Sequence, residues 1–211
     1  MIHFDPPPEP EGFDQSVRQP GNAWLASHPG GRPPAYWSAC SERLAEGFSH
    51  LCAYSAMHEP VGTVDHFVGI AADRSLAYEW SNYRYASHWI NGSKRDARVL
   101  DPFEVQDDWF EVSLPDLQPR LTDRVPQELR ELAQFTIDRL HLRDDERVIR
   151  QRRAWYGMYQ ERKLTLDGLR ECAPLIARAV QWELERVPWP TVLPSGLVSP
   201  DLLPRQPPPP V

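Results

Sequence analysis

The sequence predicts an α+β protein, and three features of its 211 residues indicate this class. An apolar stripe with helical spacing runs from Tyr36 to Leu51. Between residues 60 and 115 the chain changes to short aromatic runs broken by turn-forming residues, which is typical of short strands and loops. From Pro126 to about Val187 the helical spacing returns. We therefore expect a small mixed core with one helix before it and a helical region after it.

Composition and charge limit the class of protein further. Hydrophobic residues make up 41% of the chain and aromatic residues 10%, which is enough apolar material for about one folded domain. No apolar run approaches the roughly 18 residues that a membrane span needs, and the first ten residues do not read as a signal peptide. We therefore expect a cytoplasmic protein without a membrane partner. The net charge of −7 argues against nonspecific coating of nucleic acid but does not exclude a nuclease.

Proline divides the chain into four parts. Of the 23 prolines, eight lie in residues 1–34 and nine in residues 188–211. Proline disfavours helix interiors, so we expect residues 1–34 to form an extended arm and residues 188–211 to form a disordered tail. The arm carries four large apolar side chains that we expect to lie over the body: Phe4, Phe13, Trp24 and Leu25. The core is then residues 35–125, and the helical region is residues 126–187.

The expected helices share a one-sided apolar stripe with steps of three or four residues. The stripe of the first helix consists of Trp37, Cys40, Leu44, Phe48 and Leu51. Acidic residues at the start of the helix near Asp144 suit the helix dipole, and Pro174 is expected to bend the last helix. In chain order, the helices cover residues 36–51, 86–96, 129–140, 144–162 and 166–187. We expect strands in the runs VGTVDHFVGI, LAYEW and WFEVSL.

The residues that could carry chemistry lie between 52 and 103. Hydrolysis of a phosphodiester needs a base that activates water and a cation that neutralises the phosphate. His66 is the candidate base, because a neutral imidazole accepts a proton near pH 7. Asp65 and Asn91 offer oxygen ligands suited to Mg²⁺. Asn82 is expected to hold its loop through hydrogen bonds to the backbone.

The segment Asp65-His66, followed by Asn82 and by Asn91-Gly-Ser-Lys94, resembles the motif of the HNH (ββα-metal) endonucleases. With the runs CAYS, TVDHF, AYEWSNYR and VLDPFEV, the chain looks most like the HNH components of retron and Septu-type anti-phage defence systems. The resemblance covers roughly residues 35–115. It implies a ββα core and the activity of a metal-dependent endonuclease that hydrolyses DNA or RNA.

The resemblance also implies roles for individual residues and a partner. His66 would be the general base, and Asn82 the structural asparagine of the catalytic site. Asp65 and Asn91 would bind Mg²⁺ or Mn²⁺, and Lys94, with Arg95 beside it, would contact phosphate. Membership of such a defence system implies an ATPase partner that gates cleavage. The chain itself contains no G-x-x-x-x-G-K-[ST] phosphate loop, so the ATPase would be a separate protein.

Two departures from the family pattern keep a second hypothesis open. Many relatives carry two Cys-x-x-Cys pairs that bind structural zinc, whereas this chain has Cys52-Ala-Tyr-Ser55 and Ser87-His-Trp-Ile90. Three of the four thiolates are missing, so we expect no structural zinc. Val68-Gly69 also stands where the family often has Pro-Lys. The alternative is therefore a catalytically inactive HNH-like scaffold that binds a partner protein or nucleic acid.

Overall fold

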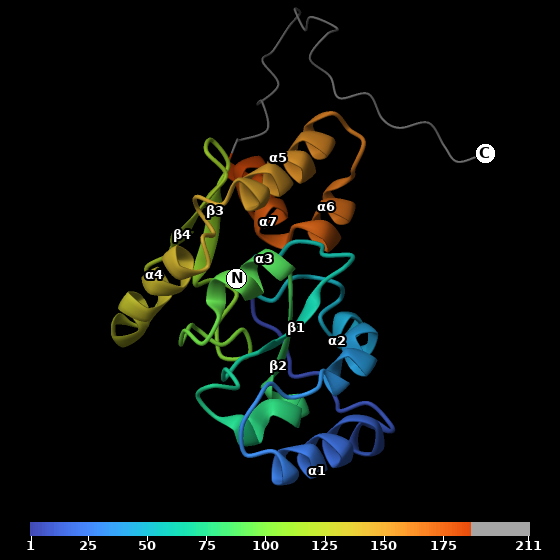
Figure 1. Cartoon of the computed structure of the whole chain (residues 1–211). Helices are drawn as coiled ribbons and strands as arrows, with labels where there is room; N and C mark the ends of the chain where they lie inside the picture. Colours follow the sequence, from blue (N-terminus) through green and yellow to red (C-terminus); the bar gives the residue numbers. More distant parts are fainter. Residues whose placement is uncertain (187–211) are drawn as a thin grey trace, which may run out of the picture.

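A computed structural model describes residues 1–186 and confirms the α+β class (Figure 1). Two antiparallel sheets of two strands each lie among short helices. β1 (Thr63–His66) pairs with β2 (Tyr83–Ala86), and β3 (Phe110–Ser113) pairs with β4 (Gln118–Leu121). The proline-rich tail predicted over residues 188–211 lies outside the described residues.

The first sheet and the helix that follows it form one unit. α3 (His88–Lys94) begins two residues after the end of β2, within the segment 86–96 that the sequence predicts to be helical. α3 lies against β1, and the side chain of Asn91 donates a hydrogen bond to the backbone oxygen of Val64 at 3.3 Å. The chain order of strand, strand and helix is the one that the resemblance implies.

The N-terminal arm differs from the prediction because it contains helical structure. A π-helical turn, η1 (Asp14–Arg18), leads directly into α1 (Gln19–Ser27). Pro20 lies in the first turn of α1, where a missing N–H and a fixed φ are tolerated, so the proline content alone misled the prediction. The arm packs on the body as expected: Phe4 and Phe13 are buried, and Trp24 and Leu25 are half-buried.

The helix predicted over residues 36–51 is shorter and is split in two. A 3-10 helix, η2 (Tyr36–Cys40), precedes α2 (Ser41–Gly47). The backbone then leaves the helix, because Ser49 and His50 adopt positive φ angles of 51° and 53°. The apolar spacing identified the buried face correctly, since Leu44 and Phe48 are fully buried, but it did not indicate where the helix ends.

The run LAYEW, predicted as a strand, forms turns of 3-10 helix instead. η3 (Arg74–Tyr78) is followed by η4 (Trp80–Asn82). Asp73 caps η3, because its carboxylate accepts a hydrogen bond from the backbone N–H of Ser75 at 2.9 Å. This local cap and the hydrogen bonds of Asn82 described below outweigh the strand preference of the aromatic residues.

The C-terminal part of the described chain is helical, as predicted. It consists of η5 (Gln127–Leu129), α4 (Arg130–Arg139), α5 (Glu146–Gln160), α6 (Leu166–Cys172) and α7 (Pro174–Arg186). The predicted last helix is two helices rather than one bent helix. Pro174 begins α7 because it cannot supply the N–H that a continuous helix needs at this point. α7 packs against β3 (Figure 1).

The two sheets and the helices share one hydrophobic core, which extends from Phe4 and Phe13 in the arm to Ile176 and Val180 in α7. Within residues 1–186, none of the helices has the length and apolar character needed to cross a membrane.

Candidate active site

Asp65 and His66 are neighbours on β1, but their side chains lie on opposite faces of the sheet, as successive residues of a strand do. The strand register places His66 opposite Tyr83 and Asp65 opposite Arg84. Asp65 is buried, whereas His66 is half-buried. The two residues of the motif therefore lie in different environments, and each is considered separately.

His66 is held in one orientation and one tautomer. Its Nε2 lies 2.9 Å from the backbone oxygen of Ala77. Because a carbonyl oxygen only accepts hydrogen bonds, Nε2 carries the proton and Nδ1 carries the lone pair. Nδ1 has no hydrogen-bond partner within residues 1–186, and it is not fully buried. This is the arrangement that a general base needs.

Burial and aromatic neighbours keep the His66 ring neutral. Burial lowers the pKa of His66 from its usual value of 6.5, so the imidazole is uncharged at pH 7. Tyr83 donates its hydroxyl proton to the same Ala77 oxygen at 2.9 Å, and burial raises the pKa of that phenol. Trp37 packs edge-on against the imidazole, with ring centroids 4.6 Å apart. These contacts fix the ring without occupying Nδ1.

Asn82 holds the loop between β1 and β2 through three hydrogen bonds to the backbone. Its amide oxygen accepts from the N–H of Val68 at 2.8 Å. Its amide nitrogen donates to the backbone oxygens of Val68 at 3.0 Å and of Leu76 at 3.1 Å. Asn82 is buried. These bonds are of the kind that the sequence analysis expected, and they position the loop that carries Ala77.

Asp65 and Lys94 form an ion pair in the interior. The ammonium of Lys94 lies 3.2 Å from Oδ1 of Asp65 and 2.8 Å from the backbone oxygen of His66. Tyr54 donates its hydroxyl to Oδ2 of Asp65 at 2.5 Å, a short charge-assisted hydrogen bond. The side chain of Lys94 is 0% exposed and that of Asp65 is 2% exposed. Lys94 therefore differs from the prediction, in which it lay at the surface and contacted phosphate.

The other two predicted residues lie at the surface side of α3. Asn91 is half-buried, and because its amide nitrogen faces the Val64 oxygen, its amide oxygen is not used in that bond. Arg95 follows the last residue of α3 and is exposed, with a positive φ of 50°. Of the two basic residues predicted to bind nucleic acid, Arg95 is thus the one that can reach a phosphate from its described position.

The described arrangement does not fit a divalent cation at Asp65. Both carboxylate oxygens already have partners, and one of these partners is a positive charge that would repel the cation. Asn91 alone offers one neutral oxygen, which is a weak ligand set for Mg²⁺ or Mn²⁺. Within residues 1–186, no three His, Cys, Asp or Glu side chains come together as a metal site either. The predicted roles of Asp65 and Asn91 as metal ligands therefore need a rearrangement of Lys94.

The four positions that the predicted resemblance compares with zinc ligands are buried in this chain. Cys52 and Ser87 are in contact: Sγ lies 3.8 Å from the Ser87 hydroxyl and 3.5 Å from its backbone nitrogen. Ser55 and Ile90 are also buried. One thiol, two hydroxyls and an alkyl group are not a zinc ligand set. Hydrogen bonding and apolar packing fill these positions.

Sequence reasoning missed the residues that support the predicted ones. The sequence analysis gave Tyr54 and Tyr83 no role in the site, yet their hydroxyls bond to Asp65 and to the carbonyl that orients His66. Trp37 was assigned only to a helical stripe. No spacing rule signals these contacts, because each joins residues from separate turns and strands of the chain.

Comparisons with known proteins identified no relative of this chain. No protein-family model matches the chain, and no curated protein is similar enough in sequence to count as a match.

Proposed function

We propose that this chain is an endonuclease of the HNH type in which His66 is the general base. The observation that carries the proposal is the state of His66. Its Nε2 is bonded to Ala77, its Nδ1 has no partner within residues 1–186 and is not fully buried, and its pKa is lowered by burial. A fixed, neutral imidazole with one open lone pair is suited to take a proton from water.

In the proposed reaction, Nδ1 of His66 accepts a proton from a water molecule as the water oxygen attacks phosphorus. The bond between phosphorus and the leaving oxygen breaks, and that oxygen takes a proton from solvent. The imidazolium then returns its proton to solvent. The Ala77 carbonyl, which accepts from Nε2, stabilises the positive charge on the ring during this step.

Arg95 supports nucleic acid as the substrate. It is exposed and follows α3 directly, and within residues 1–186 it forms no ion pair. A guanidinium of this kind binds phosphate oxygens in a bidentate manner and provides affinity without reading sequence. Replacement of Arg95 by Gln should therefore weaken binding of DNA and RNA without changing the pH dependence of cleavage.

A second candidate function is favoured by the buried Asp65–Lys94 pair. If Lys94 stays on Asp65, the site cannot take up the cation on which HNH relatives rely, and the chain would act as a binding scaffold. Lys94 makes two hydrogen bonds from a fully buried position, so its removal from Asp65 has a substantial free-energy cost.

Cleavage assays distinguish the two functions. Plasmid DNA, single-stranded DNA and tRNA are incubated with wild type and with His66→Ala, in Mg²⁺, in Mn²⁺ and in EDTA. We expect His66→Ala to lose at least about 100-fold in rate, the usual contribution of a general base. His88→Ala, at an exposed position of α3, is the matched control and should cleave like wild type. Equal activity of wild type and His66→Ala, or equal inactivity of both with the partner ATPase and ATP present, would contradict the nuclease proposal.

We extend the proposal to a partner ATPase, as the resemblance to anti-phage defence systems implies. The test is to co-express this chain with an ATPase encoded beside it. We expect the two proteins to co-purify, and cleavage by the complex to depend on ATP. A chain that cleaves equally well with and without the ATPase would contradict the gated arrangement.

A further inference from the structure

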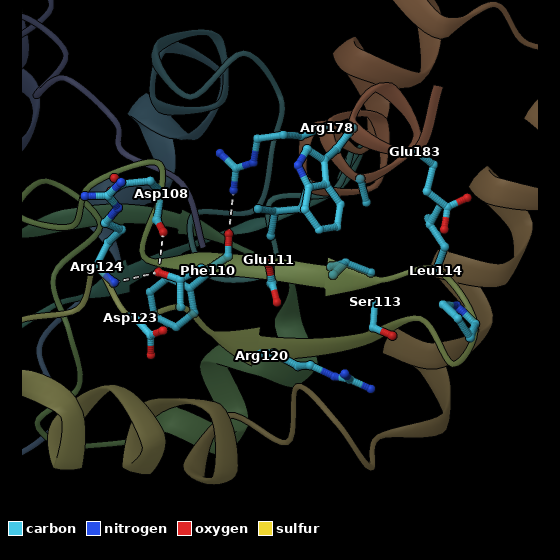
Figure 2. Close-up of a pocket in the computed structure, with 16 residues that line it drawn as sticks. Asp108, Phe110, Glu111, Ser113, Leu114, Arg120, Asp123, Arg124, Arg178 and Glu183 are labelled. Carbon is cyan, nitrogen blue, oxygen red and sulfur yellow. Dashed lines mark hydrogen bonds between the residues drawn. The ribbon is translucent and has the colours of Figure 1, made fainter. Parts of the chain in front are cut away.

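A groove lies between β3 and α7, and His66 is not among the residues that line it. It has a volume of about 780 Å³, and Figure 2 shows the side chains that line it. Residues of β3 form its floor, and Leu175, Ala179 and Trp182 of α7 form its apolar wall. Trp182 is 56% exposed, which is unusual for so large an apolar side chain. The proposed nuclease activity makes no use of this groove.

The edge of β3 offers backbone groups to this groove. Thr122 donates its N–H to the oxygen of Trp109, so these two residues form a hydrogen-bonded pair of the β3–β4 ladder. Pairs alternate in an antiparallel ladder, so the backbone groups of Phe110 and Val112 point away from β4. Pro119, which stands opposite Val112, has no N–H and agrees with this assignment.

The two outward residues of β3 differ in what they meet. The guanidinium of Arg178 donates to the backbone oxygen of Phe110 at 2.5 Å (Figure 2). Within residues 1–186, nothing outside the sheet bonds to the N–H or the oxygen of Val112. Proteins usually cover or charge such an edge, because it can pair with another chain. Here Arg178 covers one position, whereas Val112 lines the groove without a backbone partner outside the sheet within the described residues and is itself 4% exposed.

Charge on the groove wall indicates which side chains an added strand would carry. Asp108, Glu111, Asp123 and Glu183 line the groove, and within the described residues none of them forms an ion pair. Of the three basic lining residues, Arg120 is already paired with Asp116 at 2.9 Å and Arg178 is bonded to Phe110, which leaves Arg124 as the one without an ion pair within the described residues. The unpaired charge of the groove is therefore mainly negative, and it favours basic side chains.

We propose that this groove binds an extended peptide of a partner protein, which adds a strand to the free edge of β3. The peptide backbone would pair with the N–H and the oxygen of Val112, as in other cases of strand addition. Because side chains of a strand alternate between faces, the peptide would carry apolar residues toward Trp182 and basic residues toward Glu111. The ligand class is thus an extended segment of alternating apolar and basic residues.

The test uses the full chain and a fluorescent probe peptide, Val-Lys-Val-Lys-Val, blocked at both ends. We expect saturable binding by fluorescence anisotropy and slower hydrogen exchange at the amide of Val112. Val112→Pro removes the outward N–H, which edge strands tolerate, and should weaken binding roughly tenfold. Val112→Ala keeps the N–H and is the matched control. Trp182→Ala, at an exposed position, should also weaken binding about tenfold.

Changes to the probe test the proposal without any change to the protein. A probe with its three central amides N-methylated should not bind, and Val-Glu-Val-Glu-Val should bind at least about tenfold more weakly. Equal binding of the N-methylated probe would overturn strand addition, and so would unchanged affinity of Val112→Pro. If the protein is a dimer and the Val112 amide is already protected from hydrogen exchange without the probe, the groove would be assigned to a second copy of the chain. Binding that appears only after removal of residues 187–211 would assign it to that segment. Either result would overturn the proposal.

Discussion

The two sheets of this protein have strands of equal length but are stabilised differently. All four residues of β2 are buried, whereas buried and exposed residues alternate along β3. β2 is therefore enclosed on both faces, and the buried polar side chains of this sheet must find partners inside the protein. The β3–β4 sheet keeps one face and one edge open. Internal bonding positions the candidate active site in the first sheet, and an open edge creates the candidate docking groove in the second.

If the two sheets differ in this way, the largest change in the free energy of unfolding should come from the buried ion pair of the first sheet. Lys94→Met leaves the carboxylate of Asp65 buried without its counterion. Loss of one partner of a buried pair typically costs about 3–5 kcal/mol, so we expect a decrease of this size in the free energy of unfolding. Denaturation in urea measures it. The double variant Asp65→Asn/Lys94→Met should recover part of the loss, because Tyr54 then keeps a neutral acceptor.

The matched control lies in the second sheet. Arg120 of β4 pairs with Asp116 at 2.9 Å, but both side chains are about half exposed. Exposed pairs contribute roughly 0–1 kcal/mol, so Arg120→Met should decrease stability by no more than that. Similar losses for Lys94→Met and Arg120→Met would show that Lys94 is not enclosed as described.

An intermediate effect is expected from the two asparagines of the candidate site. Asn82→Ala removes three hydrogen bonds and leaves backbone groups of Val68 and Leu76 without partners, so we expect a loss of about 2–3 kcal/mol. Asn91→Ala removes one long bond of 3.3 Å from a half-buried position and should cost about 1 kcal/mol or less. Thermal or urea denaturation of both variants checks the difference. Equal losses would contradict the separate roles of the two residues.

The sequence predicted those parts of the fold that depend on local spacing. The apolar spacing identified the buried face of α2, and the acidic residues at the start of α5 marked its N-terminus, where Asp145 caps the helix. Prediction from the sequence failed where a local cap or a tertiary contact decides the secondary structure. The proline content predicted an extended arm instead of α1, although a proline in the first turn does not prevent a helix. The aromatic composition predicted a strand where the chain forms η3, which Asp73 caps.

The sequence placed the predicted site residues on neighbouring elements but did not predict how their side chains are arranged. Asp65, His66, Asn91 and Lys94 do lie on β1 and α3, which pack together. The spacing of Asn91 and Lys94 could not show that Lys94 points inward. A lysine three residues after an asparagine in a helix can reach either the solvent or the strand on which the helix packs. The inward direction depends on Tyr54 and Asp65, which together provide a buried polar environment. Such an environment comes from the packing of distant segments.

The smallest effect that we predict concerns the pH dependence of stability, and it arises from His66. Burial lowers the pKa of His66 in the folded protein below the value of 6.5 that it has when unfolded. The unfolded chain therefore binds more protons as the pH falls below 6.5, and the free energy of unfolding decreases in that range. His66→Gln keeps an N–H donor near the Ala77 oxygen but does not titrate. The stability of wild type relative to His66→Gln should therefore fall between pH 8 and pH 5, measured by urea denaturation at each pH. Other titrating groups contribute equally to both proteins and cancel in this difference. A difference that stays constant, or that grows toward low pH, would show that the folded protein does not favour the neutral imidazole on which the proposed base depends.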